Sequence, residues 1–308
     1  MSQLIALENG KLMKRTAVLL MLSLLGRAVP AGAQSSNLVK IPFELVNGLV
    51  LVSASINGDT GSFILDTGSP MVVVNPRNVE GLQPVNTQQS YAFRGRPVKV
   101  NHFSWAGIER EGMDALAMDI SHLENASHRK ILGVIGYEVL NKYEVMFDCR
   151  NQVLLLYEPR NSWIHERETP LFSFRFQMRD ELPVIKARIG GKKVHLGLDT
   201  GGTANLLSEK LMGQLPASSL RNAKEETIFG LANIPEKKNS ALVDGLEVEG
   251  KLLHASRFLF TDLSHLDDVH IEGLLAMPFL SQFRFSINYR KNRVYIWSHG
   301  EEINFRTI

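Results

Sequence analysis

The sequence contains a single cysteine, Cys149, among its 308 residues. One cysteine excludes an internal disulfide and a metal site built from several thiolates. The chain also has no basic run interleaved with aromatic residues, which argues against nucleic acid as a partner. No Gly-x-Ser-x-Gly motif is present to indicate a serine nucleophile. Because 44% of the residues are hydrophobic, an apolar core must hold the fold together.

An uninterrupted apolar run long enough to cross a membrane is also lacking, because Arg27 breaks the apolar segment near the N-terminus. Lys14-Arg15 precede that segment, and the small residues 31–33 follow it. This order predicts a secretory signal peptide over residues 1–33, with an uncleaved inner-membrane anchor as the alternative. Removing these residues changes the formal net charge from +2 to −1, so charge indicates no polyanionic partner.

One sequence pattern occurs twice along the chain. Residues 49–58 align without gaps to residues 182–191, and both copies continue in register to an Asp-Thr-Gly tripeptide, at Asp66 and Asp199. In each copy a β-rich run reaches an Asn-Gly or Gly-Gly turn signal, and a second β-rich run leads into the aspartate. We therefore expect two hairpins, each delivering one carboxylate.

The duplication continues to the end of the chain. Residues 119–124 match 262–267, residues 133–140 match 273–280, and residues 145–157 match 285–297. We expect two lobes, residues 34–162 and 163–308, with short strands dominating and short helices at 137–141 and 208–215. The fold class is mainly β.

The paired motifs resemble those of the pepsin-like and retropepsin-like aspartic endopeptidases. They are Asp66-Thr67-Gly68-Ser69 with Gly133, and Asp199-Thr200-Gly201-Gly202 with Gly273. The likeness covers about residues 45–300 and is greatest to bacterial exported proteins of retropepsin type with both lobes in one chain. It implies a bilobal acid protease fold: two duplicated β-barrel-like lobes with the active-site cleft between them.

The resemblance makes Asp66 and Asp199 a catalytic pair. Two neighbouring carboxylates cannot both ionise, so one keeps a proton while the other takes a proton from a bound water, as in aspartic proteases. No metal, cofactor or covalent intermediate is required. The implied partner is an extended polypeptide from the envelope or periplasm, and the implied protein is a periplasmic monomer without a stable membrane span after signal cleavage.

The resemblance also assigns supporting roles around the two loops. Thr67 and Thr200 hydrogen-bond across to the opposite loop, and the glycines after them let main-chain N–H groups approach the carboxylates. The resemblance implies that the hydroxyl of Ser69 supports an outer carboxylate oxygen. The equivalent residue of the second lobe, Gly202, has no hydroxyl, so we expect an asymmetric pair of aspartates. The remaining implied residues are the loop glycines Gly68 and Gly201, and Gly133 and Gly273 beneath the loops. Flap hairpins are implied at 91–98 and 227–233.

Other interpretations remain open from the residues. His122 and His265 each lie near an aspartate, but duplicated positions usually lie far apart, which disfavours a metal site. Cys149 sits in an apolar strand, as a buried structural cysteine does. Residues 197–203 resemble the phosphate-binding hairpin of actin-like sugar kinases, although the first copy lacks the second glycine. A catalytically silent, two-lobed peptide-binding protein is the other alternative.

Overall fold

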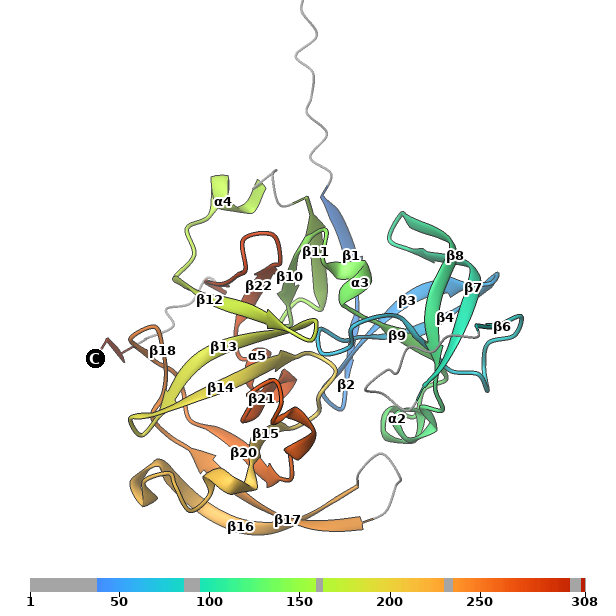
Figure 1. Cartoon of the computed structure of the whole chain (residues 1–308). Helices are drawn as coiled ribbons and strands as arrows, with labels where there is room; N and C mark the ends of the chain where they lie inside the picture. Colours follow the sequence, from blue (N-terminus) through green and yellow to red (C-terminus); the bar gives the residue numbers. More distant parts are fainter. Residues whose placement is uncertain (1–37, 86–94, 159–162, 230–234, 300–305, 308) are drawn as a thin grey trace, which may run out of the picture. The chain divides into compact units, whose positions relative to one another are not determined.

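The computed structural model of the chain describes residues 38–85, 95–158, 163–229, 235–299 and 306–307 (Figure 1). The predicted signal peptide and the predicted boundary at residue 162 lie outside these residues. The described part is mainly β, as expected from the sequence, with strands in two sheets and a few short helices.

The first copy of the pattern runs to the end of β11. Its elements are β1 (Val39–Pro42), β2 (Glu44–Val46), β3 (Leu49–Ile56), β4 (Asp59–Leu65), β5 (Val73–Val74), β6 (Gln83–Pro84), β7 (Arg96–Trp105), β8 (Ile108–Ala117), α2 (Ser121–Ser127), β9 (Ile131–Ile135), α3 (Tyr137–Leu140), β10 (Glu144–Asp148) and β11 (Val153–Tyr157). The predicted helix at 137–141 corresponds to α3.

The second copy repeats this order. Its elements are α4 (Trp163–Arg167), β12 (Phe172–Arg179), β13 (Leu182–Ile189), β14 (Lys192–Asp199), β15 (Asn205–Ser208), β16 (Leu220–Phe229), β17 (Pro235–Val243), β18 (Leu246–Val248), β19 (Lys251–Leu252), β20 (Ser256–Thr261), β21 (Gly273–Ala276), α5 (Met277–Leu280), β22 (Arg284–Asn288), β23 (Arg293–Trp297) and β24 (Arg306–Thr307). The helix predicted over 208–215 is wrong in extent, because β15 includes Ser208 and only a 3₁₀ turn, Glu209–Leu211, follows.

The two predicted hairpins are present. Asn57 and Gly58 join β3 to β4 with φ of 50° and 94°, and Gly190 and Gly191 join β13 to β14 with φ of 55° and 84°. Positive φ at both central residues is the geometry of a tight hairpin turn that suits Asn and Gly. Each hairpin leads directly to one aspartate.

In each copy, one glycine-bearing strand packs beside the strand that ends at the aspartate. β9 runs parallel to β4 and antiparallel to β5, and β21 runs parallel to β14 and antiparallel to β15. The chain segment after each aspartate thus crosses to the far side of β9 or β21. This topology holds the aspartate loop between three paired strands.

The two copies share one sheet, in which neighbouring strands follow the order β1, β11, β10, β22, β23 and β12 (Figure 1). β10 of the first copy pairs antiparallel with β22 of the second, and Phe147 stacks on Phe285 at a ring distance of 4.6 Å. Both rings are fully buried. The junction is therefore continuous with the apolar core.

One carboxylate is buried in this shared sheet. The Glu144 side chain is 1% exposed, accepts hydrogen bonds from Tyr157 and Ser286, and pairs with His165 Nε2 at 3.0 Å. Asn288 Nδ2 donates to its other oxygen. Burial raises the pKa of Glu144, but the bonds from His165, Ser286 and Asn288 outweigh burial and lower it. The carboxylate thus links β10, β11, α4 and β22.

The equivalent residue of the second copy is Arg284. It pairs with Glu168, just after α4, at 2.6 Å. Glu144 and Arg284 occupy matching positions in the two copies, and both bind side chains in or just after α4.

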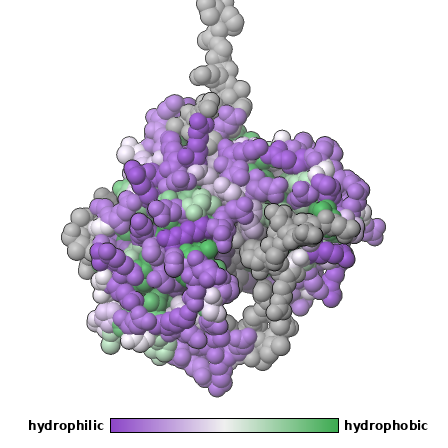
Figure 2. All heavy atoms as spheres, in the orientation of Figure 1, coloured by the Kyte–Doolittle hydropathy of each residue, from purple (hydrophilic) through white to green (hydrophobic). Residues whose placement is uncertain are grey.

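The surface shown in Figure 2 is mostly hydrophilic, with small apolar patches between hydrophilic ones. Among the described residues, no helix has the length and apolar character needed to span a membrane.

Candidate active site

Both aspartates lie in tight loops that aim main-chain N–H groups at their own carboxylates. Gly68 N donates to Asp66 Oδ1 at 2.6 Å, and Gly201 N donates to Asp199 Oδ1 at 2.9 Å. Asp66 directly follows β4, and Asp199 is the last residue of β14. Such bonds favour the ionised form of a carboxyl group.

The glycines of the two loops pack against the opposite carboxylate. A Cβ added to Gly201 would lie 2.5 Å from Asp66 Oδ2, and one added to Gly68 would lie 3.0 Å from Asp199 Oδ1. Both separations are shorter than normal contacts of a real Cβ. The fold therefore brings together two aspartates that are 133 positions apart in sequence.

Thr67 and Thr200 cross between the loops in a symmetrical pattern. Thr67 Oγ1 donates to Leu198 O at 2.8 Å and accepts from Thr200 N at 3.1 Å. Thr200 Oγ1 donates to Leu65 O at 2.9 Å and accepts from Thr67 N at 3.0 Å. Both threonines are fully buried, so these four bonds have no competition from water. They fix the distance between the two aspartate loops.

The expected role of the Ser69 hydroxyl is wrong. Ser69 Oγ donates to Met71 O at 2.9 Å, which turns the hydroxyl toward its own loop. The main-chain N–H of Ser69 interacts with Asp66 instead. A serine side chain one residue beyond the glycine can satisfy a nearby carbonyl of its own turn, and this short-range bond prevails over the carboxylate.

The two loops differ in a complementary way. Ser69 O accepts a hydrogen bond from Tyr137 N, and a Cβ on Gly136 would overlap Ser69 O. In the second lobe the glycine is Gly202, and a Cβ added to it would lie 2.9 Å from Ala276 Cβ and 2.9 Å from Asp199 Oδ2. Each lobe thus has one glycine in this pair of neighbouring positions. It is Gly136 in the first lobe, beside Ser69, and Gly202 in the second, beside Ala276.

Burial raises the pKa of both catalytic candidates. For Asp66, hydrogen bonds from Gly68, Asp199 and Gly201 oppose this rise. For Asp199, burial is reinforced by the negative charge of Asp66, so its pKa lies well above the ordinary value. The two carboxyl groups therefore share one proton and titrate as a pair.

Gly133 and Gly273 lie on the strands beside the aspartate strands. A Cβ on Gly133 would overlap Val73 O, and a Cβ on Gly273 would lie 2.5 Å from Leu206 O. The missing side chains therefore let β9 and β21 pass close to the strands that follow the aspartates.

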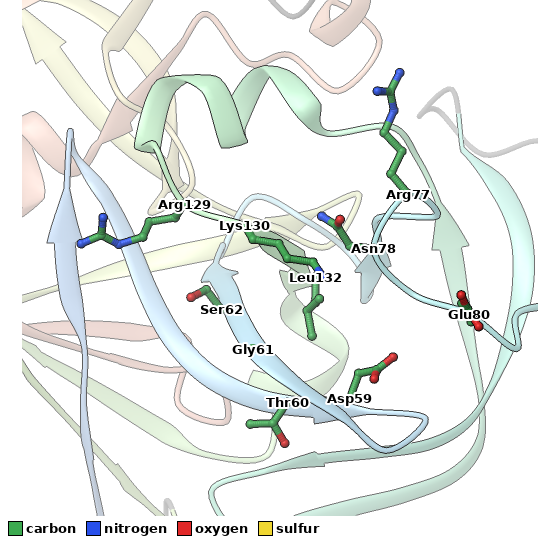
Figure 3. Close-up of a pocket in the computed structure, with 10 residues that line it drawn as sticks. All are labelled: Asp59, Thr60, Gly61, Ser62, Arg77, Asn78, Glu80, Arg129, Lys130 and Leu132. Carbon is green, nitrogen blue, oxygen red and sulfur yellow. The ribbon is translucent and has the colours of Figure 1, made fainter.

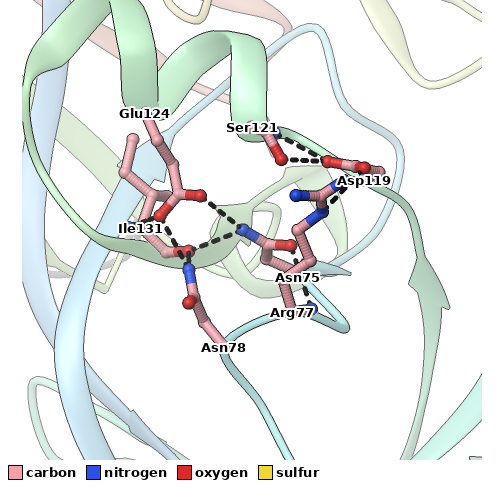
Figure 4. A network of polar contacts seen from close by, with 7 residues as sticks. All are labelled: Asn75, Arg77, Asn78, Asp119, Ser121, Glu124 and Ile131. Carbon is pink, nitrogen blue, oxygen red and sulfur yellow. Dashed lines mark hydrogen bonds and ion pairs between the residues drawn. The ribbon is translucent and has the colours of Figure 1, made fainter.

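A polar network fixes β9 in the first lobe (Figure 4). Glu124 of α2 accepts from Asn78 Nδ2 at 2.7 Å and from Ile131 N at 2.9 Å. The buried Asn75 donates to the same carboxylate and to Ile131 O. Sequence analysis missed this network, although Asn75 and Asn78 lie just beyond the aspartate loop.

In the second lobe a single buried asparagine has a similar task. Asn205 Oδ1 accepts from Ala276 N, and its Nδ2 donates to Arg257 O, both at 2.9 Å. The aligned residue of the first lobe is Val72. The sequence did offer a signal for this role, because the repeat aligns a polar residue, Asn205, with an apolar one, Val72.

A cavity of about 660 Å³ lies away from the aspartates, between β4 and the segments 77–80 and 129–132 (Figure 3). Its two arginines point out of it in different directions, as Figure 3 shows. Arg77 pairs with Asp119 and Arg129 with Glu44. The two guanidinium groups therefore do not converge on a common ligand position.

Further residues singled out by the sequence lie elsewhere. His122 is in α2 and His265 in a 3₁₀ turn, at matching places in the two lobes. No group of three or more potential metal ligands occurs among the described residues. Burial, with the charge of Asp148, raises the pKa of Cys149 to about 12, so its thiol stays protonated. Of the predicted flap segments, residues 91–94 and 230–233 lie outside the described residues.

Comparison with known proteins agrees with this geometry. No curated protein matches the chain significantly. A family model described as "Aspartyl protease" matches residues 52–139 and 185–279, which is one match in each lobe and more than half of the chain. Each match contains one of the two aspartate loops. The chain belongs to the aspartyl protease family.

Proposed function

We propose that this protein is an aspartic endopeptidase that hydrolyses peptide bonds with a water molecule held between Asp66 and Asp199. The observation that carries the proposal is the packing of each loop glycine against the opposite carboxylate, which leaves two carboxyl groups close enough to share a proton. Family membership supports the same activity.

The proposed reaction uses the single proton that Asp66 and Asp199 share. The ionised carboxylate of the pair takes a proton from the water, which attacks the peptide carbonyl. The protonated carboxyl group donates a hydrogen bond to the carbonyl oxygen and stabilises the charge that develops there. The proton taken from the water then passes to the leaving amine as the peptide C–N bond breaks, and the pair returns to its singly protonated state. No metal or covalent intermediate takes part.

The finer parts of the proposal concern place and substrate. The basic, apolar and small residues of segment 1–33 support export to the periplasm of a bacterium. Two lobes in one chain support an active monomer, and an extended envelope or periplasmic polypeptide is the proposed substrate. The mainly β fold and the family match leave the sugar kinase without support.

The test compares the purified mature chain with its Asp66→Asn and Asp199→Asn variants on a peptide library from acidic to neutral pH. Each variant should lose activity by about 10³-fold or more, because one proton-transfer partner and one charge-stabilising group disappear. Asp59→Asn, an exposed aspartate on the same hairpin as Asp66, is the matched control and should keep full activity.

Thermal melting should show that all three variants are folded. Undiminished cleavage by both active-site variants would contradict the proposal. Peptide binding by the wild type with no cleavage at any pH would instead identify a catalytically silent binding protein.

A further inference from the structure

The second lobe carries a basic pocket away from the aspartates. The pocket has a volume of about 600 Å³ and lies among β12, β13, β23 and the turns after β18 and β22. It is lined by Arg175, Phe176, Gln177, Val184, Lys186, Glu249, Lys291, Asn292 and Arg293. Four basic side chains and one acidic side chain give it a formal excess of three positive charges.

The basic groups of this pocket are not balanced within the protein. Arg175 and Arg293 are direct partners across β12 and β23. Like charges in that position repel, so the pair costs stability unless an anion lies between them. Glu249 accepts a bond from Arg175 N, which places its carboxylate on the main chain of β12.

Several other basic residues of the same lobe have acidic partners. Lys210, Arg221, Lys224, Lys237, Lys238, Arg257 and Arg284 each form an ion pair. By contrast, within the described parts of the chain, the side chains of Arg175, Lys186 and Lys291 form no ion pair with a carboxylate. The positive charge of these three pocket side chains is therefore not paired with a carboxylate of the described residues.

The first lobe provides an internal control. Pro42 pairs with Val153 as Arg175 pairs with Arg293, and Phe43 N bonds to Gln152 O just as Phe176 N bonds to Asn292 O, both at 3.0 Å. The four positions that are basic in the second lobe are Pro42, Ser53, Asn151 and Val153 in the first. The shared backbone therefore does not require positive charge at these positions.

We propose that this pocket binds a phosphate-bearing anion. Guanidinium groups suit the oxygens of a phosphate, which accept two parallel N–H bonds, and lysine ammonium groups add charge from the pocket wall. The volume exceeds that of inorganic phosphate and falls in the range of small-molecule sites. The phosphate belongs either to a soluble phosphorylated compound or to a lipid headgroup.

The test uses the double variant Lys186→Ser/Lys291→Asn, in which each lysine is replaced by its first-lobe counterpart. The matched control is Lys142→Gln, an exposed lysine that is likewise replaced by its counterpart, Gln282. Both are compared with the wild type by calorimetric titration with inorganic pyrophosphate. Flotation with vesicles of phosphatidylcholine, with and without phosphatidylglycerol, forms the second arm.

Wild type and control should bind pyrophosphate, the phosphatidylglycerol vesicles or both, and the double variant should bind at least about tenfold more weakly. Binding should weaken as salt rises from low to physiological concentration. Binding of pyrophosphate alone identifies a soluble ligand, and binding of vesicles identifies a headgroup. Equal binding by wild type and double variant, or no binding in either arm, would overturn the proposal.

Thermal melting and peptide hydrolysis keep the outcome clear. The double variant should melt at or above the wild-type temperature, because it removes repulsion at exposed positions. Its peptidase activity should match that of the wild type, so loss of anion binding is separable from the proposed proteolysis.

Discussion

In the first lobe Ser69 follows the Asp-Thr-Gly loop and faces Gly136, whereas in the second lobe Gly202 takes that place and faces Ala276. Thr67 and Thr200 of the same loops form four hydrogen bonds between the two lobes, and each threonine hydroxyl donates one and accepts one. The bonds that join the lobes have therefore stayed symmetrical, while the surroundings of each aspartate differ. This difference places the two carboxyl groups in unequal environments.

The largest contrast between the lobes should come from their loop glycines. Gly201→Ala should lower kcat for peptide hydrolysis by about 10³-fold, because the new Cβ would overlap the Asp66 carboxylate. Gly68→Ala should cost less, about tenfold, because its Cβ would lie 3.0 Å from Asp199 Oδ1, a tight contact that a small shift relieves. Steady-state kinetics on one peptide substrate measures both. Equal losses would mean that the loops are interchangeable.

The shared sheet offers the next contrast. Glu144→Ala should lower the free energy of unfolding by about 3–5 kcal/mol, because His165 and several buried donors lose their acceptor. Arg284→Ala, at the matching but more exposed position, should cost about 1 kcal/mol. Urea unfolding at neutral pH measures both.

Acidification sharpens this prediction. Because the pKa of Glu144 is lowered in the fold, its stabilising effect exists above the ordinary carboxyl pKa and is lost as pH falls through the lowered value. The stability difference between wild type and Glu144→Ala should therefore shrink at acidic pH. A constant difference would show that packing, and not charge, is responsible.

The symmetrical part of the comparison predicts equal effects. Thr67→Val and Thr200→Val should each destabilise the protein by about 2–3 kcal/mol, because each leaves a buried N–H and a buried carbonyl without a partner. Thr→Ser variants keep the hydroxyl and serve as controls. Thermal melting that ranks the two valine variants differently would break the symmetry.

The smallest effect concerns the glycine that changes sides. Gly202→Ala should cost about 1–2 kcal/mol, because its Cβ would lie 2.9 Å from both Ala276 Cβ and Asp199 Oδ2, and adding Ala276→Gly should restore part of the loss. Gly136→Ala in the first lobe should not be rescued this way, since it meets main-chain oxygens. A double-mutant cycle by urea unfolding gives the coupling. Zero coupling would contradict the complementary packing.

The sequence predicted the two hairpins and the pairing of Asp66 with Asp199 because these depend on local signals repeated at a constant spacing. Turn glycines and an alternating β pattern act within a few residues. The bond from Ser69 to Met71 was not predictable, because two acceptors were within reach of one hydroxyl. The partners of Glu144 were hidden because they come from three separate segments, β11, α4 and β22.

The antiparallel pairing of β10 with β22 fixes how the two copies are aligned along the shared sheet. Its register places Glu144 opposite Asn288. A slip by one residue would move one half of the molecule by about 3.4 Å and turn every side chain of the slipped strand to the other face. Glu144 would then lose its hydrogen-bond donors. The buried carboxylate therefore specifies one register between the two halves.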